Sequence, residues 1–298
     1  MTALPVSTRN PFNSIAIPLL LATALAGGLI AKSGVWSSPA PEMPAPVTVT
    51  VPAGSFDHRE TGEFFRDGFA VDGPKVRKSF NRPMTIMKHQ VSTAAYDECV
   101  ANGACASRES LTPSRTDLPV TGVNFDDANT YARWLSEKTG MVWRLPSDEE
   151  LAFAAGSKYP DDALGVDPDS RNPALRWLAD YERETARKAS RVKEPQPYGS
   201  FGEGEYGLAD FAGNIWEWTS TCLRRVNLDR KGRSIGEVES CGIYIAAGKH
   251  RSPLSSFVRD PKGGGCSVGT PPDNVGFRLV HDDRWYAPLL FAISRQSM

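Results

Sequence analysis

Two short segments near the start of the globular part have the residue pattern of β-strands. Residues 47–51 (Val-Thr-Val-Thr-Val) alternate apolar and polar side chains, and a Pro-Ala-Gly turn ends the run. Residues 83–87 (Pro-Met-Thr-Ile-Met) predict a second strand. We expect a helix to start near Ser92, because Tyr96 and Val100 then share one face at i and i+4.

Two helices with clear start signals are predicted in the middle of the chain. The first is capped by Asp126 and stops at Gly140, and its core-facing stripe at helical spacing comprises Ala128, Tyr131, Trp134 and Leu135. The second opens with a capping box, in which Ser147 and Glu150 satisfy each other's backbone amides.

The stretches 157–205 and 223–275 are rich in Pro, Gly, Asp and Arg and predict long irregular loops. Strand content is therefore expected to be modest. No linker divides residues 47–282, so we expect one α+β domain there, followed by a tail at 283–298.

Composition excludes one class of function. The chain has 298 residues, 40% of them hydrophobic, which is enough to bury a sizeable core. Its formal net charge is −1, and it contains no long basic run. Nucleic-acid binding therefore has no electrostatic support.

The N-terminal region has the features of an export signal. Residues 15–31 are apolar, follow Arg9, and contain an Ala-Leu-Ala sequence that a signal peptidase could cut. We expect residues 1–36 to be either a cleaved signal peptide or an anchor in the membrane, and the Pro-rich residues 37–46 to be an extended tether. Either alternative places the domain outside the cytoplasm, in the periplasm or an equivalent extracytoplasmic space.

Five cysteines in an exported chain favour disulfides over thiol chemistry. Cys99 and Cys105 flank an Asn-Gly turn that can bring their Cα atoms within about 7 Å, so we predict a disulfide between them. Cys222, Cys241 and Cys266 leave one further pair and one odd thiol, and the three pairings remain open.

Five segments, in a fixed order, carry a resemblance to a known family. They are residues 51–56 (Val-Pro-Ala-Gly-Ser-Phe), 119–128 (Pro-Val-Thr-Gly-Val-Asn-Phe-Asp-Asp-Ala), 144–151 (Arg-Leu-Pro-Ser-Asp-Glu-Glu-Leu), 206–218 (Tyr-Gly-Leu-Ala-Asp-Phe-Ala-Gly-Asn-Ile-Trp-Glu-Trp) and 274–279 (Asn-Val-Gly-Phe-Arg-Leu). Together they resemble the formylglycine-generating enzyme, or sulfatase-modifying factor, family over most of the chain. The resemblance implies a variant of the C-type-lectin fold with little regular secondary structure.

The segment 206–218 also has the composition of a cation site. It contains two carboxylates and a glycine that lets the backbone bend, and Ca²⁺ prefers about 6–8 oxygen ligands of carboxylate and carbonyl type. The resemblance implies a structural Ca²⁺ at the positions that match the family's ligands, Asp210, Gly213, Ile215 and Glu217. The alternative is a tight buried turn with Trp216 and Trp218 in the core.

The family's chemistry depends on two cysteines a few residues apart, which bind copper and oxidise a substrate cysteine with oxygen. The corresponding stretch here, residues 246–259, contains no cysteine. Soft thiolate ligands suit Cu(I) and cannot be replaced by hydroxyls. We therefore do not expect the formylglycine-forming activity or a copper cofactor.

Other metal sites have weaker support. The four histidines include no i, i+4 pair, which argues against the non-haem iron of a second branch of the superfamily. Met84, Met87 and His89 could bind copper, although a buried Met-containing strand is the simpler explanation.

A cationic loop lies where the family places its active cleft. It comprises Lys249, His250, Arg251 and Arg259. Such a loop could receive an anion or an acidic peptide, and a solvated loop is the alternative.

These observations support two hypotheses about function. The first is a non-enzymatic module that binds an exported protein or peptide. Its arrangement looks most like accessory proteins encoded beside copper nitrite reductases, which implies a role in maturing an envelope enzyme. The second is an oxidase of the formylglycine-generating type with relocated active residues, such as Cys241 or Cys266.

Overall fold

The computed structural model describes residues 43–188, 192–264 and 272–296, which belong to one compact unit, Met43–Met298. The predicted signal peptide or anchor, the first six residues of the tether and Cys266 lie outside the described residues. None of the described helices has the length and apolar character needed to cross a bilayer.

A four-stranded antiparallel sheet contains both strands predicted near the start of the domain. β1 (Thr48–Val51) and β6 (Met84–Met87) pair with Val49 opposite Ile86, and the strand order is β1-β6-β12-β7. β12 (Val280–His281) and β7 (Trp143–Arg144) complete the sheet. The prediction for residues 47–51 and 83–87 is confirmed.

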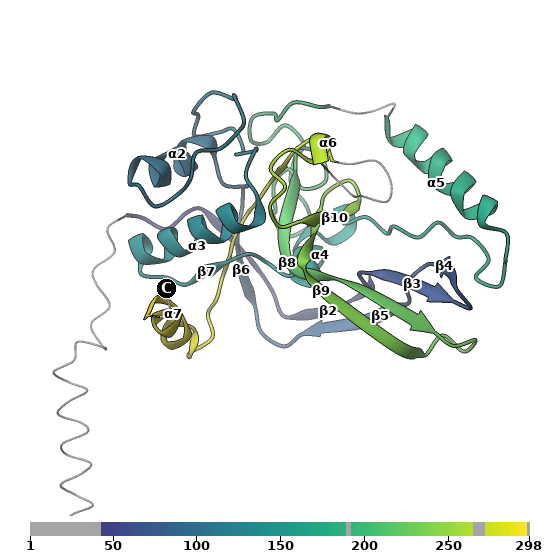
Figure 1. Cartoon of the computed structure of the whole chain (residues 1–298). Helices are drawn as coiled ribbons and strands as arrows, with labels where there is room; N and C mark the ends of the chain where they lie inside the picture. Colours follow the sequence, from purple (N-terminus) through teal and green to yellow (C-terminus); the bar gives the residue numbers. More distant parts are fainter. Residues whose placement is uncertain (1–42, 189–191, 265–271, 297–298) are drawn as a thin grey trace, which may run out of the picture. The chain divides into compact units, whose positions relative to one another are not determined.

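A six-stranded sheet has the order β10-β9-β8-β3-β4, with β11 (Val275–Gly276) paired to β8. Its central strands, β8 (Trp216–Leu228) and β9 (Ser234–Ala247), form a long hairpin (Figure 1), so the prediction of irregular structure over 223–275 is wrong. The sheet also contains β3 (Glu63–Arg66), β4 (Phe69–Val71) and β10 (Arg251–Ser255). β2 (Gly54–Arg59) and β5 (Lys75–Phe80) form a separate pair.

The predicted helices are present as α2 (Thr93–Ala101), α3 (Phe125–Thr139) and α4 (Asp148–Ala155). Ser147 and Glu150 form the expected capping box of α4. The predicted cap of α3 is wrong, because Asn124 rather than Asp126 accepts the Asp127 N–H, and the Asp127 carboxylate accepts the Asn124 N–H in return. This reciprocal pair satisfies two amides at the start of the helix.

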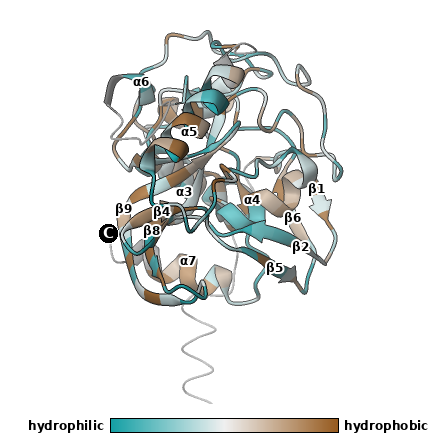
Figure 2. Cartoon of the chain, turned by 90° about the vertical axis from the view of Figure 1, so that its right-hand side faces the viewer, coloured by the Kyte–Doolittle hydropathy of each residue, from teal (hydrophilic) through white to brown (hydrophobic). Residues whose placement is uncertain are grey.

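Additional helices occupy segments for which the sequence predicted none. α5 (Pro173–Lys188) lies in the stretch predicted to be irregular, and α7 (Ala287–Gln296) lies in the predicted tail. η1 (Gly156–Lys158) and α6 (Pro261–Gly264) are short. Figure 2 shows that α5 carries apolar residues on a side that no other element covers.

Two large apolar clusters hold the domain together. The first joins α2 and α3 to the ends of β8 and β10, and includes Tyr131, Trp218 and Phe277. The second lies under α4, with Ile86 and Phe211 among its members. Met84 and Met87 are both buried, and the Met87 sulfur accepts the Leu279 N–H at 3.2 Å, as expected of core methionines.

Candidate functional site

Residues 246–259, which the resemblance matches to the family's catalytic loop, form the end of β9, a turn and β10. Leu254 is buried in the first apolar cluster. Gly248 lies so close to the Trp216 ring that a Cβ would be 2.8 Å from it, and the Trp216 indole N–H donates to the His250 carbonyl at 3.0 Å. Close packing and backbone hydrogen bonds therefore fix this stretch in place.

Arg251 points into the domain and makes several polar contacts there. Its Nε donates to the Asp162 carboxylate at 3.0 Å, and its Nη1 donates to the Arg59 carbonyl at 2.8 Å and to Thr61 Oγ1 at 3.1 Å. The same Nη1 lies 3.7 Å from Asp148 Oδ2. Burial lowers the pKa of Arg251, but the combined effect of the neighbouring acidic groups, with Asp148 first and Asp162 also contributing, outweighs it, so the pKa is raised and the guanidinium stays charged.

Asp148 is the centre of this buried polar cluster. Its carboxylate is fully buried, accepts the hydroxyls of Thr61 and Tyr159, and lies 3.3 Å from His58 Nε2. Burial raises the pKa of Asp148, yet the contact with His58, the charge of Arg251 and the hydrogen bonds from Thr61 and Tyr159 together outweigh it and hold the pKa below its usual value. Burial, with the Asp148 charge, raises the pKa of Tyr159 well above its usual value.

This cluster was not predicted from the sequence, since Asp148 lies between the capping residues Ser147 and Glu150 and carries no other local signal. The partners come from positions 58, 61, 159 and 251, which are far apart in the chain. Their proximity depends on the fold, and nothing in the local pattern around position 148 indicates it.

The four cations of the predicted cleft do not share one partner. Arg259 pairs with Asp127 at 2.9 Å and with Glu109 at 3.5 Å, whereas Arg251 pairs with Asp148 and Asp162. The His250 ring packs edge-on against Trp216, with centroids 5.2 Å apart, and Lys249 is half-buried in the same turn. Anion binding by these residues stays a prediction. A bound anion would have to compete with the carboxylates that already neutralise Arg251 and Arg259.

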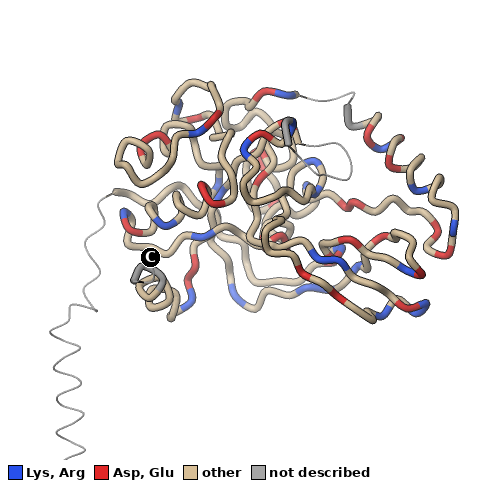
Figure 3. The backbone as a smooth tube through the Cα atoms, in the orientation of Figure 1, with Lys and Arg blue, Asp and Glu red and all other residues tan. Residues whose placement is uncertain are grey.

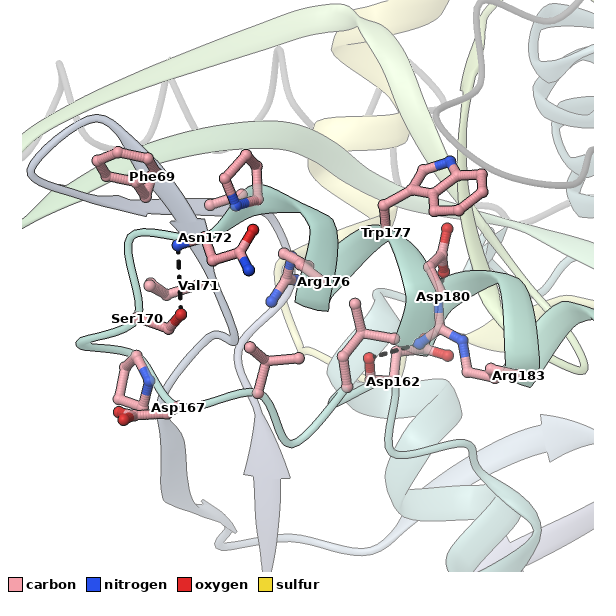
Figure 4. Close-up of a pocket in the computed structure, with 15 residues that line it drawn as sticks. Phe69, Val71, Asp162, Asp167, Ser170, Asn172, Arg176, Trp177, Asp180 and Arg183 are labelled. Carbon is pink, nitrogen blue, oxygen red and sulfur yellow. Dashed lines mark hydrogen bonds and ion pairs between the residues drawn. The ribbon is translucent and has the colours of Figure 1, made fainter.

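A groove, here called the side groove, opens beside this stretch. It consists of two adjoining pockets of about 420 and 450 Å³ that share Ala70, Val71, Asp162 and Arg176. Figure 4 shows the outer pocket, between β4, the loop 162–172 and α5. The inner pocket reaches Arg251 and Pro253, so β10 forms part of its wall.

α5 contacts the domain through polar side chains and exposes apolar ones. Arg176 pairs with Asp72 at 2.9 Å, and Arg183 Nη1 donates to the Asp162 carbonyl at 2.8 Å. The opposite side, here called the outer face of α5, consists of the exposed residues Leu175, Trp177, Leu178 and Tyr181. This arrangement is the reverse of an ordinary surface helix, in which the apolar stripe faces the core.

The predicted calcium ligand Asp210 already has protein donors. Its buried carboxylate accepts the N–H groups of Gly199 at 2.7 Å and Phe201 at 2.8 Å. The left-handed residues of the turn are Asp210 and Ala212, with φ of 61° and 60°. Gly213 is needed for a different reason, since a Cβ there would lie 2.3 Å from the Phe201 ring.

Glu217, the second predicted carboxylate ligand, forms a fully buried ion pair with Arg278. Arg278 Nε and Nη2 donate to its two oxygens at 2.5 and 2.7 Å, and Gln90 Nε2 donates to the same carboxylate at 2.8 Å. The side-chain oxygen of Gln90 has no hydrogen-bond partner among the described residues. A calcium ion at Glu217 would have to compete with Arg278, and calcium stays a prediction here.

Two disulfides are present in the described part of the chain. The predicted Cys99–Cys105 bridge is confirmed, with Cα atoms 5.3 Å apart. The open pairing is resolved in favour of Cys222 with Cys241, which join β8 to β9. Glu239 lies close to this second, partly exposed disulfide.

The chain belongs to the family of the sulfatase-modifying factor enzyme 1-like domain. The model of that family matches residues 35–283, which is most of the chain. The resemblance found in the sequence is therefore confirmed.

Individual relatives include both active and inactive proteins. The chain is 28% identical over 202 residues to the formylglycine-generating enzyme of Mycobacterium tuberculosis, covering 60% of this chain and 64% of that protein. It is 26% identical over 214 residues to the inactive C-alpha-formylglycine-generating enzyme 2 of Mus musculus, covering 70% and 61%. The chain thus spans a little under two thirds of the length of these relatives.

Among solved structures, PvdO from Pseudomonas aeruginosa shares the fold. The TM-score is 0.51 at 21% identity, over 80% of this chain and 95% of that chain. Together with the family match, this similarity confirms the predicted α+β fold of the formylglycine-generating enzyme type.

Proposed function

We propose that this chain is a non-catalytic, exported member of its family that binds a segment of a partner protein during the maturation of an envelope enzyme. The observation that carries the proposal is the absence of cysteine from residues 246–259. Copper chemistry of the family type needs two neighbouring thiolates, and the four described cysteines are used in disulfides instead.

The packing of residues 246–259 supports the same conclusion. Leu254 is buried among apolar side chains, and Arg251 neutralises the buried carboxylate of Asp148. These roles stabilise the domain and do not activate oxygen. One relative of this chain is itself described as inactive.

The side groove and the outer face of α5 are the surfaces that we assign to the partner. The groove has an apolar wall that includes Val71, Leu164 and Val166, and β4 lies at the end of its sheet. An extended peptide can pair with such an edge strand and place alternate side chains in the groove. Trp177 and Tyr181 stack beside it, with ring centroids 5.8 Å apart, and exposed aromatic side chains are typical of interface anchors.

The proposal includes three finer expectations. Residues 15–31 anchor the chain to the membrane, a structural Ca²⁺ binds near Asp210 and Glu217, and the partner is an exported enzyme such as a copper nitrite reductase. Each rests on sequence pattern or on the family resemblance.

Thiol chemistry and a direct activity assay test whether catalysis is absent. The purified protein is treated with an alkylating reagent before and after denaturation, and the copper-loaded protein is incubated with a cysteine-containing sulfatase-type peptide. We expect no rapidly alkylated thiol in the native protein and no conversion of the peptide cysteine to an aldehyde. Aldehyde formation would overturn the proposal.

Site-specific crosslinking tests the assigned surface. A photoreactive amino acid replaces Trp177 in one variant and Ile235, which is 70% exposed on β9, in a matched control. When the chain is co-expressed with an exported copper nitrite reductase, we expect a crosslink from position 177 and none from position 235. Equal crosslinking from both positions would argue against the side groove as the binding surface.

A second candidate function, an oxidoreductase with relocated cysteines, has one favourable observation. The Cys222–Cys241 disulfide is partly exposed and lies beside Glu239. If this pair carried out redox chemistry, serine at both positions would abolish an activity of the intact protein on thiol substrates. If the pair is structural, the same change lowers stability only.

A further inference from the structure

The C-terminal helix α7 leaves an apolar surface uncovered. Trp285 is 86% exposed, and three side chains of the helix are just over half exposed, at 55%, 52% and 55%: Leu289, Leu290 and Ile293. These four residues are here called the α7 surface. Figure 2 colours much of this helix as apolar, and residues 285–293 include no charged side chain.

The charge around α7 differs from that of α5, the other helix with exposed apolar residues. Residues 285–293 carry no charged side chain, and Arg284, which precedes them, is paired with Asp282, whereas acidic and basic side chains are interspersed along α5 (Figure 3). An apolar helix surface without charged side chains can enter the headgroup region without removing a charge from water, so the α7 surface suits a lipid interface better than the outer face of α5 does.

The chain enters the domain at the same corner from which α7 leaves it. The Met43 N–H donates to the Lys138 carbonyl at 3.1 Å, and the Asp282 N–H donates to the Val142 carbonyl at 2.8 Å. Lys138 and Val142 lie on either side of Gly140, which ends α3. The first described residue and the start of the C-terminal segment are therefore neighbours at one end of α3 (Figure 1).

We propose that the α7 surface lies on the membrane to which residues 15–31 anchor the chain. The inference rests on the anchor included in the proposed function. The eleven residues between that segment and Met43 can extend to at most about 40 Å, so anchoring keeps this corner of the domain close to the lipid headgroups. Anchoring raises the effective concentration of α7 at the membrane, so a short apolar helix that binds lipid weakly on its own can then bind at the membrane interface.

The aromatic residues at the start of α7 fit this location. Trp285 and Tyr286 directly precede the helix, with their rings edge-on and their centroids 5.5 Å apart. Trp and Tyr are enriched at headgroup depth, since one end of each side chain is apolar and the other is polar. The contact would fix the orientation of the domain and leave α5 and the side groove accessible to a partner.

Lipid crosslinking in the full-length chain tests the inference. A photoreactive benzoylphenylalanine replaces Ile293, which is 55% exposed, in one variant and the more exposed Ile235 (70%) in a control. Both are reconstituted in vesicles of phosphatidylethanolamine and phosphatidylglycerol and irradiated. We expect several-fold more phospholipid adduct, detected by intact mass, at position 293 than at 235. Adding Leu289→Glu and Leu290→Glu to the first variant is expected to abolish the adduct, and these exposed side chains can change without loss of the core.

The outcomes separate failure of this inference from failure of the anchor. If the chain resists carbonate extraction but position 293 forms no lipid adduct, the anchor stands and the role of α7 is overturned. If carbonate releases the chain and no adduct forms, the anchor is wrong and the inference falls with it. In cells, a crosslink from position 293 to a protein in place of lipid would overturn the inference in favour of a protein partner.

Discussion

The buried ion pair between Arg278 and Glu217 gives a sharp prediction about stability. Both side chains are fully buried, and the guanidinium also donates to the carbonyls of Lys88 at 2.8 Å and Ala209 at 2.9 Å. Arg278 therefore joins the end of β6, the turn before β8 and β8 itself. Replacing it by methionine keeps much of the side-chain volume and removes every donor.

The expected loss follows from the charge that remains. Removing one partner of a buried pair costs about 3–5 kcal/mol, because the other charge is left uncompensated. Two carbonyls also lose a donor, but such contributions within one network are not additive. We therefore expect Arg278→Met to lower the free energy of unfolding by about 4 kcal/mol, out of the roughly 5–15 kcal/mol typical of a domain.

Urea denaturation followed by tryptophan fluorescence measures this change. The matched control is Arg225→Met, which breaks a pair between Arg225, with a side chain that is 62% exposed, and Glu63. Exposed pairs contribute about 0–1 kcal/mol, so the control should unfold nearly as the unmodified protein does. Adding Glu217→Leu to Arg278→Met removes the stranded carboxylate, and the double variant should be more stable than Arg278→Met alone.

Two results would refute the reasoning. If Arg278→Met costs no more than the exposed control, burial does not determine the strength of this pair. If the double variant is less stable than Arg278→Met alone, the loss comes from packing and not from the uncompensated carboxylate.

Three further predictions concern pH, disulfides and calcium. The pKa of Asp148 is lower in the folded state than its ordinary value of 3.8, so its ionised form stabilises the fold above that pH. This stabilisation is lost as pH falls through the folded pKa. The difference in urea midpoint between the unmodified protein and Asp148→Asn should therefore be largest near pH 7 and shrink below pH 4. Replacing both Cys222 and Cys241 by serine should lower the free energy of unfolding by about 3 kcal/mol. Replacing both Cys99 and Cys105, whose disulfide closes a shorter loop, should lower it by about 2 kcal/mol. Thermal melting of the two double variants compares these losses. Ca²⁺ at a hundredfold excess over Kd should stabilise the fold by about 3 kcal/mol, measured as a higher melting temperature, and Asp210→Ala should remove this effect. An unchanged melting temperature after complete chelation would exclude a structural calcium.

The elements that could be predicted from the sequence are those with local signals. α3 and α4 have capping residues and an apolar stripe, and β1 alternates along its length. The N-terminal end of α3 was placed two residues late, because Asn124 and Asp126 are both good caps and only the reciprocal bond with Asp127 decides between them.

The β8–β9 hairpin and α5 were not predicted, for two different reasons. The first nine residues of β9 are all exposed, so neither face carries the alternation that indicates a half-buried strand. α5 turns polar side chains such as Arg176 toward the domain and Trp177 toward solvent. Leu175, Leu178 and Tyr181 nevertheless recur at helical spacing, so α5 carries an amphipathic signal that the Pro- and Gly-rich composition of 157–205 obscured.

In the candidate site, too, contacts within one short segment could be predicted, and contacts between distant segments could not. Cys99 and Cys105 lie on one short loop, so their pairing could be predicted, whereas the pairing of Cys222 depends on the register of β8 against β9. The contacts of Asp148 depend likewise on segments that meet only in the folded chain.

The position of Arg251 explains how residues 246–259 are held rigidly in this domain. In β10 its guanidinium balances the buried charge of Asp148, so charge balance inside the domain holds the strand, and no metal is needed for that purpose. β10 also forms part of the wall of the side groove through Pro253. A groove with a fixed wall needs less ordering when a peptide binds, so less of the interaction energy is lost to conformational entropy. The residues that hold β10 in place thus also favour the proposed binding function of the surface beside it.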